Sequence, residues 1–248
     1  MRLLLLRAAL LVVVLAAWEL IARPLDPILY VAPSTLPQAV LRLLRQPDIP
    51  PLLEHLGVTM RAILTAYALA VGAGLSLGFL MGFWRVLQRT YEPILSALYA
   101  VPSVVWYPSL MLLFGLGPAS KVAFGFLLGF FPIVLSVLAG IQQANRHLLT
   151  VAVSMGASRW EIYWKVLLPG MAGTLASGLR SGLALSVVGV LAGELLGSRA
   201  GVGYVINYVY NLLKTPEYVA LVVIMAAVVL VIDGAAARVE SRIKRWAG

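Results

Sequence analysis

The chain has 248 residues, of which 61% are hydrophobic and 12% are charged, and its formal net charge is +9. Soluble domains are roughly 45–50% apolar and about 25% charged, so this composition excludes a water-soluble globular protein and predicts a polytopic membrane protein. The positive charge is interpreted as basic residues that hold loops on the cytoplasmic side, and not as a surface for nucleic acid.

Residue types that carry chemistry are scarce. The sequence contains no cysteine and only two histidines, His55 and His147, which lie far apart. Thiolate chemistry is therefore excluded and a metal site is not expected. No phosphate-binding G-x-x-x-x-G-K-[ST] pattern occurs, so the chain is not expected to bind a nucleotide. We expect no catalytic residue, no metal and no cofactor on this chain.

Six apolar runs are long enough to cross about 30 Å of hydrocarbon, which takes roughly 20 helical residues. They cover residues 3–21, 59–83, 94–116, 122–142, 174–196 and 218–237. The predicted fold is an all-α membrane protein with about six transmembrane helices. The Lys and Arg residues fall mostly on one side of this arrangement, which predicts that both termini are cytoplasmic.

The first run has two interpretations. Arg2 and Arg7 before the apolar stretch also fit the start of a secretory signal peptide. The stretch continues to Ile21, however, and no small-x-small cleavage site precedes Arg23. We therefore expect residues 1–22 to be a retained N-terminal transmembrane helix.

Residues 23–58 form a proline-rich segment that is expected to be external and to contain one short amphipathic helix. Thr35 can cap this helix. Its apolar face is expected to hold Leu36, Val40, Leu43 and Leu44, opposite Arg42 and Arg45. The remaining residues, 59–248, are expected to form one core with five further helices.

The second run carries Gly74, Gly78 and Gly82 at intervals of four. This spacing places three missing side chains on one helix face, so another helix can approach closely. Ordinary packing and a moving interface both remain open.

The third run is interrupted by Pro102 and Pro108, which are expected to bend it. Ser103, Trp106 and Tyr107 lie between the two prolines and could line a passage for a small polar or anionic solute. Tyrosine and tryptophan also favour membrane interfaces and helix contacts, and that reading stays open.

The segment between the fourth and fifth runs, residues 144–169, is polar and is called here the helical hairpin. Ser158 and Glu161 have the S-x-x-E spacing of a capping box, which starts a helix at Ser158. Gly156 can take the left-handed conformation that ends the preceding helix, so a tight turn through Ala157 is predicted. Pro169 is expected to separate the second short helix from the next run.

Arg180 and Glu194 are charged residues in or beside the fifth run. A helix would place them about 21 Å apart, which is too far for them to pair. Because a charge that faces lipid is costly, each needs its own partner. A structural role and a role at a gate or along a solute path are both open for each.

The helical hairpin resembles the loop E-A-A-x-x-x-G, nine residues, I-x-L-P of the permease subunits of binding-protein-dependent ATP-binding cassette importers. Matching positions are Ala152, Gly156, Leu168 and Pro169, and Val166 stands at the isoleucine position. Thr150 and Val151 stand where the family usually has Glu and Ala. "LLFGLGPASKVAFGFLLGFFPIVLSVLAGI" and "GLRSGLALSVVGVLAGELLGSRAGVGYVI" are similar to the nitrate, sulfonate and taurine branch.

The resemblance implies a permease core in the bacterial plasma (inner) membrane that is not itself an enzyme. Its hairpin would dock on a separate ATPase subunit that holds ATP and Mg²⁺. A second copy of the permease, as a homodimer, and an extracytoplasmic solute-binding protein would complete the transporter. The docking residues would be Thr150, Ala152, Gly156, Ala157, Ser158, Glu161, Val166, Leu168 and Pro169.

The implied solute is nitrate-, sulfonate- or taurine-like, or a pyrimidine precursor. Three other classes of membrane protein are alternatives. A secondary transporter would show inverted repeats and coupled ionisable residues, and an intramembrane enzyme would show a nucleophile with its base or paired carboxylates. A membrane scaffold would need neither bent helices nor the hairpin. Copurification of a nucleotide-binding subunit would separate the importer from all three.

Overall fold

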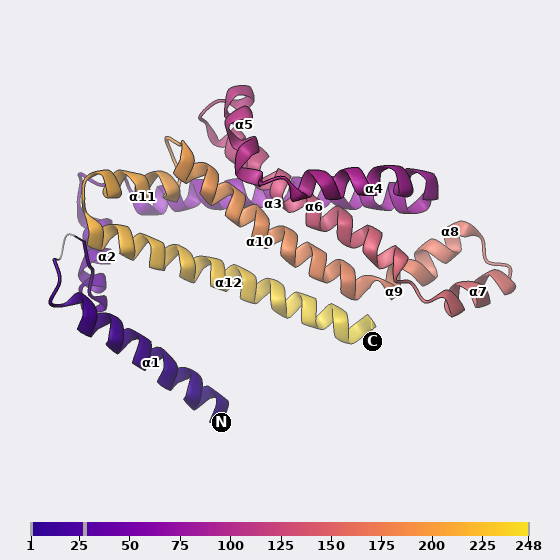
Figure 1. Ribbon diagram of the computed structural model, residues 1–248, viewed down its shortest axis with the longest axis horizontal. Coiled ribbons are helices and arrows are strands. Elements are labelled where there is room, and N and C mark those ends of the chain that lie inside the picture. The colour runs from indigo at the N-terminus through magenta and orange to yellow at the C-terminus, as the bar shows by residue number, and fades with distance from the viewer. Residues whose placement is uncertain (1, 27–28, 248) are drawn as a thin grey trace.

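The computed structural model describes residues 2–26 and 29–247, and within those ranges all regular structure is helical (Figure 1). Five helices are long and apolar enough to cross a membrane. They are α1 (Arg2–Ala22), α3 (Leu52–Phe83), α6 (Pro118–Gln142), α10 (Ala172–Leu196) and α12 (Thr215–Ala247). A sixth span is present if the bent pair after α3 is taken as one crossing. The predicted all-α membrane fold is confirmed.

Shorter helical elements connect the long ones. Before α3 lie the 3-10 turn η1 (Pro33–Thr35) and α2 (Leu36–Arg45). Between α3 and α6 lie α4 (Arg85–Ala100), the 3-10 turn η2 (Ser103–Trp106) and α5 (Tyr107–Phe114). Then follow α7 (Arg146–Ser154), α8 (Arg159–Ile162), the π-helical turn η3 (Tyr163–Leu167), α9 (Leu168–Gly170) and, after α10, α11 (Val202–Asn211).

Helix α6 lies at the centre and touches α10 almost backbone to backbone. A Cβ added to Gly189 of α10 would lie 2.7 Å from the Cα of Gly125 in α6. A Cβ added to Gly129 would lie 2.8 Å from the carbonyl oxygen of Gly182. Small residues allow this approach, and packing then supplies the stabilisation that the hydrophobic effect does not supply between helices in lipid.

On its other side α6 lies against the glycine face of α3. A Cβ on Gly78 would come within 2.7 Å of the Val137 Cβ, and one on Gly74 within 2.8 Å of Ile133. The third glycine, Gly82, faces Ile141 in the same way. The close approach expected from the four-residue spacing is therefore made by α6.

The third predicted span differs from expectation. Its helix begins at Arg85 instead of residue 94, and the chain bends by 91° between α4 and the segment Ser103–Phe114. Pro102 stands at the bend and has no N–H to continue the hydrogen-bond ladder of α4. A kink was predicted, but the structure has a break.

The short helix in the external segment is also rotated relative to the prediction. Leu43 is 2% exposed, but Leu44 is 54% exposed and Ala39 takes its place in the core. The Thr35 hydroxyl donates to the carbonyl of Ala32 and does not cap α2. The difference arises because α2 packs on α11 and α12. These tertiary contacts decide which face of α2 is buried, and the number of apolar residues on each face does not.

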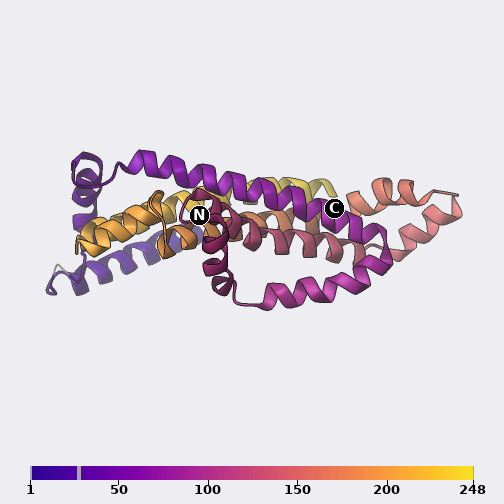
Figure 2. The same ribbon diagram turned by 90° about the horizontal axis from the view of Figure 1, so that it is seen from above.

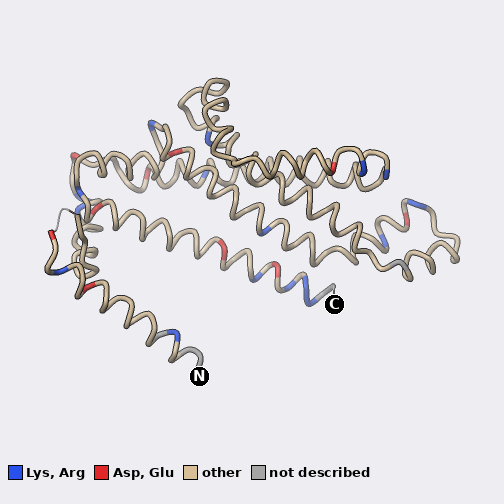
Figure 3. Tube along the Cα trace, in the orientation of Figure 1, with Lys and Arg blue, Asp and Glu red and all other residues tan. Residues whose placement is uncertain are grey.

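Helices α3, α6, α10 and α12 run side by side, α1 stands apart from them, and the helical hairpin projects from one end of the bundle (Figures 1 and 2). Basic residues gather at the same end, at the turn between α3 and α4, on the hairpin and in the last turn of α12 (Figure 3). The count of Lys and Arg residues predicts that this end of the bundle is cytoplasmic. The orientation of the chain in the membrane stays a prediction.

Candidate functional site

The turn of the helical hairpin is fixed by its backbone. Gly156 has φ 79° and ends α7. The N–H of Ala157 donates to the carbonyl of Ala152 at 3.0 Å, and the N–H of Gly156 donates to that of Val153 at 2.9 Å. This pair of bonds is a Schellman motif, which needs a residue that tolerates the left-handed region. The predicted left-handed glycine is confirmed.

The second helix of the hairpin begins with the predicted capping box. The Ser158 hydroxyl accepts from the Glu161 N–H at 3.3 Å, and the Glu161 carboxylate accepts from the Ser158 N–H at 3.1 Å. Lys165 donates to the other carboxylate oxygen at 3.0 Å. The hydrogen bond from Lys165, and then those from Ser158, lower the pKa of Glu161 to about 2. The two caps together make the turn rigid.

The base of the hairpin is anchored to the bundle by Tyr163. This side chain is 6% exposed, and its hydroxyl donates to the Phe79 carbonyl on α3 at 3.2 Å. Burial raises the pKa of Tyr163 to about 12. Its ring also lies against Phe83, with the ring centroids 5.8 Å apart. A displacement of the hairpin would therefore reach α3 directly.

Pro169 does not separate the hairpin from the next span as expected. It occupies the first turn of α9, and the Met171 N–H still donates to the Leu167 carbonyl at 2.9 Å. The chain passes through the π turn η3 and α9 into α10 with only a one-residue irregularity at Met171. Proline is tolerated there because the first turn of a helix has no partner for its N–H.

Four of the nine predicted docking residues line one of two hollows beside the hairpin, and the other five line neither. A cleft of about 520 Å³ lies between the short helices and is lined by Leu148, Val151, Ala152, Met155, Lys165, Val166, Pro169 and Gly170. Thr150 instead lines a polar cavity of about 790 Å³ with Arg85, Gln88, Arg89, Glu92 and Gln142. Met155 and Trp160 are 82% and 61% exposed, so the hairpin presents apolar surface outside the bundle. Such a surface suits a protein partner.

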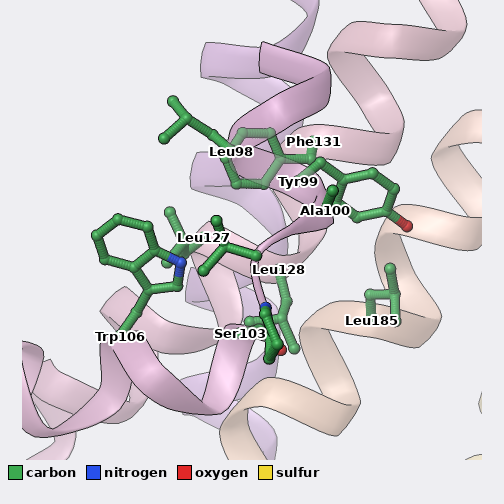
Figure 4. Close-up of a pocket in the computed structure, with 11 residues that line it drawn as sticks. Leu98, Tyr99, Ala100, Ser103, Trp106, Leu127, Leu128, Phe131 and Leu185 are labelled. Atoms are coloured by element: carbon green, nitrogen blue, oxygen red, sulfur yellow. The ribbon is translucent and has the colours of Figure 1, made fainter. Parts of the chain in front are cut away.

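A second cavity, of about 310 Å³, lies at the break between α4 and η2 (Figure 4). Ser103 and Trp106, predicted as pathway candidates, both line it. Tyr107 does not. It is 1% exposed, packs on Phe124 and donates its hydroxyl to the Gly193 carbonyl at 2.5 Å. The structure places Tyr107 in the packing between α5, α6 and α10.

Glu194 is 2% exposed and lies outside this cavity. Its carboxylate accepts from the Thr59 hydroxyl at 2.9 Å and from the Gly203 N–H at 2.9 Å. Thr59 in turn accepts from the Val202 N–H at 2.8 Å. The carboxylate therefore joins α10, α3 and the first turn of α11. Sequence reasoning missed Thr59, whose position at the edge of a predicted span was the only signal.

Arg180 has the partners that its depth required. Its guanidinium donates to both oxygens of Asp233, at 2.8 and 2.7 Å, and to Glu240 at 3.0 Å. The Ser177 hydroxyl also donates to Glu240, at 2.8 Å. This network joins α10 to α12. Asp233 was overlooked in the sequence although it is a charged residue inside the predicted span 218–237.

Residues 70–245 match the family model described as "Binding-protein-dependent transport system inner membrane component". The chain is 32% identical over 117 residues to a taurine transport system permease protein of Escherichia coli, which covers 47% of this chain and 42% of that protein. It is 31% identical over 155 residues to a formylaminopyrimidine transport permease protein of Halalkalibacterium halodurans, which covers 61% of this chain and 60% of that protein.

A third relative is a riboflavin transport system permease protein of Chloroflexus aurantiacus, 35% identical over 85 residues, or 34% of this chain and 32% of that protein. The matched segments therefore span less than two thirds of each relative. Among solved structures, inward-facing conformations of the MetNI methionine ABC transporter superpose with a TM-score of 0.66 at 20% identity. The superposition covers 77% of this chain and 95% of that chain, and it indicates a shared fold.

Proposed function

This chain belongs to the family of binding-protein-dependent transport system inner membrane components, and from that membership we propose that it is the permease subunit of an ATP-binding cassette importer. The chain forms the pathway for a small solute, and a separate ATPase subunit, which holds ATP and Mg²⁺, drives transport. The permease catalyses no reaction itself. A second copy of the chain, as a homodimer, and an extracytoplasmic solute-binding protein complete the transporter in the inner membrane.

The shape of the helical hairpin supports this proposal most directly. Its turn is fixed by the Schellman motif at Gly156 and by the capping box of Ser158 and Glu161, and it projects from one end of the bundle (Figure 1). A partner can move such a unit only if the unit does not deform. The apolar cleft beside Val166 supplies a surface on which the ATPase docks in the cytosol.

The hairpin is joined to α3 and α10, and α10 lines the cavity through Leu185. The Tyr163 hydroxyl donates a hydrogen bond to α3, and the chain continues from the hairpin through η3 and α9 into α10. Both α3 and α10 pack on α6 through glycine faces. When the ATPase subunits close, displacement of the hairpin therefore shifts α3 and α10, and the break at Pro102 gives the adjoining segment freedom to reorient.

A test of the coupling uses the full-length chain, tagged and purified from membranes of its own host. We expect an ATP-hydrolysing subunit to copurify at one per permease. Gly156→Val should greatly reduce that capture and the associated ATPase activity, because a β-branched residue at φ 79° costs about 1 kcal/mol or more. No atom lies within 4 Å of an added Cβ at Gly156, so the strain is confined to the backbone.

The matched control is Gly156→Asn, because asparagine tolerates the left-handed region and should retain capture and activity. Equal amounts of all three proteins in the membrane show that insertion is unaffected. The proposal fails if the Val variant retains full capture and ATPase activity, or if no nucleotide-hydrolysing subunit accompanies the wild-type chain.

The solute in this proposal is nitrate-, sulfonate- or taurine-like, or a pyrimidine precursor. The relatives above are named for taurine, a formylaminopyrimidine and riboflavin, so family membership alone leaves these classes open. The cavity at the break, at about 310 Å³, is large enough for a solute of this size.

A further inference from the structure

We propose that the cavity at the break between α4 and η2 binds a neutral solute with a single heteroaromatic ring, in preference to a small anion. The inference rests on the proposed function, since it assigns the solute class of the same pathway. The depth of the cavity, the chemistry of its lining, its polar groups and its size support this assignment.

The cavity lies about halfway through the bundle. Phe131 falls near the middle of α6 (Pro118–Gln142), and Leu185 falls near the middle of α10 (Ala172–Leu196); both line the cavity. The third wall is the break at Pro102 itself. Non-helical backbone at membrane depth is tolerated where it lines a water-filled cavity, so the break and the cavity explain each other.

Aromatic rings frame this space. Tyr99 lies against Phe131, with the ring centroids 5.7 Å apart, and Trp106 stands on the other side of the break (Figure 4). A flat ring that enters between them can stack on one and meet the edge of another, which gains more than aliphatic contact alone. The remaining lining is aliphatic, from Leu98, Val101, Leu127, Leu128 and Leu185.

Three polar side-chain groups belong to residues that line the cavity. They are the hydroxyls of Tyr99 and Ser103 and the indole N–H of Trp106. Within the described part of the chain none of them has a hydrogen-bond partner. A heterocycle with ring nitrogens and a carbonyl or amino group can satisfy such donors and acceptors, whereas a purely apolar ring would leave them unpaired.

The lining residues include no charged side chain. The basic residues of α6 and α10, the two long helices that line the cavity, are committed elsewhere. Arg180 is paired with Asp233 and Glu240, and Lys121 is 1% exposed and donates to the Leu116 carbonyl at 2.6 Å. An anion in the cavity would lose hydration without gaining a counter-charge, which is costly, whereas a neutral ring would not.

The volume of the cavity also limits the size of the solute. Small-molecule sites commonly measure about 300–1,000 Å³, and this cavity, at about 310 Å³, is at the lower limit. One ring with small substituents fits this space. A fused three-ring solute would require the lining to open.

The test compares two probes that share a ring and differ in charge. Uracil is neutral near pH 7, and orotate is the same ring with a carboxylate. Binding of each to the purified full-length chain in lipid nanodiscs is measured by equilibrium dialysis. We expect saturable uracil binding, with orotate and methanesulfonate at least ~10-fold weaker, a difference that corresponds to about 1.4 kcal/mol.

The variants Trp106→Leu and Tyr99→Leu should each weaken uracil binding by roughly 10-fold or more, because each removes a stacking face. Matched controls are Trp84→Leu and Tyr91→Leu, which remove exposed aromatic side chains of the same types outside the cavity and should bind as the wild type does. Equal elution from a sizing column shows that all four variants are folded.

The inference is overturned if either anion binds as tightly as uracil, if no saturable uracil binding is found up to about 1 mM, or if the Trp106 and Tyr99 variants bind like their controls. These outcomes leave the proposed function untouched, because copurification of the ATPase and its loss in Gly156→Val do not depend on the solute. Conversely, if uracil binds but no ATPase subunit copurifies, the proposed importer function is contradicted and the proposed solute class of the cavity is supported.

Discussion

At the scale of single residues, Glu161 shows how an exposed carboxylate fixes a turn. It accepts hydrogen bonds from the Ser158 N–H and from Lys165, and these contacts hold its pKa near 2, below the ordinary value of 4.5. A carboxyl whose pKa is lower in the folded state contributes stability above its unfolded pKa and loses it on acidification. The cap at Ser158 should therefore weaken as pH falls from about 4.5 toward 2.

This sign gives a direct prediction for the helical hairpin. Amide protection of Ser158, Glu161 and Ile162, whose N–H groups are bonded in the cap, should fall between pH 5 and pH 3 after correction for the intrinsic rate of exchange. Glu161→Ala should have low protection at both pH values, because alanine cannot accept from the Ser158 N–H. Hydrogen–deuterium exchange with mass spectrometry measures both. A pH dependence that survives in Glu161→Ala would show that another group is responsible.

Glu194 differs from Glu161, because its carboxylate is buried and accepts hydrogen bonds from other helices. We predict that Glu194→Leu lowers the apparent melting temperature, because the Gly203 N–H loses its acceptor at a cost of about 1–3 kcal/mol. The Thr59 hydroxyl keeps only the longer bond to the His55 carbonyl, at 3.2 Å. Glu194→Gln retains one acceptor and should lie between that variant and the wild type. The exposed Glu54→Leu serves as the control.

Uptake by Glu194→Gln tests the other reading of this residue. If transport is normal at equal protein levels, the charge of Glu194 has no role along the solute path, as expected from its position outside the cavity. An apparent melting temperature of Glu194→Leu equal to that of the wild type would instead contradict the structural role.

At the scale of elements, the contact between α3 and α6 depends on which side chain opposes each glycine. Val137 opposes Gly78 with its Cβ, which is fixed to the backbone, at 2.7 Å from an added Cβ. Ile141 opposes Gly82 with its terminal Cδ1, at 2.0 Å, and the next atom is 3.5 Å away. The closer contact is therefore the more easily relieved, because Cδ1 can rotate away and Cβ cannot.

We predict that Gly78→Ala destabilises the protein by about 1–3 kcal/mol and that Gly82→Ala costs less, despite the shorter distance. Adding Ile141→Val to Gly82→Ala should restore stability, because valine lacks Cδ1. Gly72→Ala on the open face of α3, where no atom lies within 4 Å, should be tolerated. Apparent melting temperatures of the detergent-solubilised proteins give the order. The reverse order for Gly78 and Gly82 would contradict this packing.

Sequence patterns located the elements whose causes are local. The turn at Gly156 and the cap at Ser158 depend on residues within a few positions of each other, so the local sequence is enough to predict both. The break at Pro102 was predicted only as a kink, because its 91° angle depends on how α5 packs against α6. The partners of Glu194 and Arg180 were not predicted, since contacts between distant segments leave no local pattern.

At the scale of the whole molecule, the bundle has a tightly packed centre and a looser edge. Helices α3, α6 and α10 meet through glycines, whereas α12 is largely exposed and is joined to α10 by polar contacts. In α12, Asp233 and Glu240 both bind Arg180, and Lys244 also binds Glu240, at 2.7 Å. The C-terminal half of α12 therefore depends on charge more than on close packing, whereas its first turns pack in the apolar core through Ala220, Leu221 and Met225.

This dependence predicts the behaviour of Arg180→Gln. Asp233 would keep its charge without a guanidinium, and a charge at membrane depth costs on the order of 2.5–3.5 kcal/mol. We expect a lower apparent melting temperature and a lower amount of protein in the membrane. Combining Arg180→Gln with Asp233→Asn and Glu240→Gln should recover much of the loss, because no charge is then left unpaired. Arg242→Gln, an exposed basic residue of α12 outside this network, is the control. Equal melting temperatures for Arg180→Gln and Arg242→Gln would mean that α12 is held by apolar contact instead.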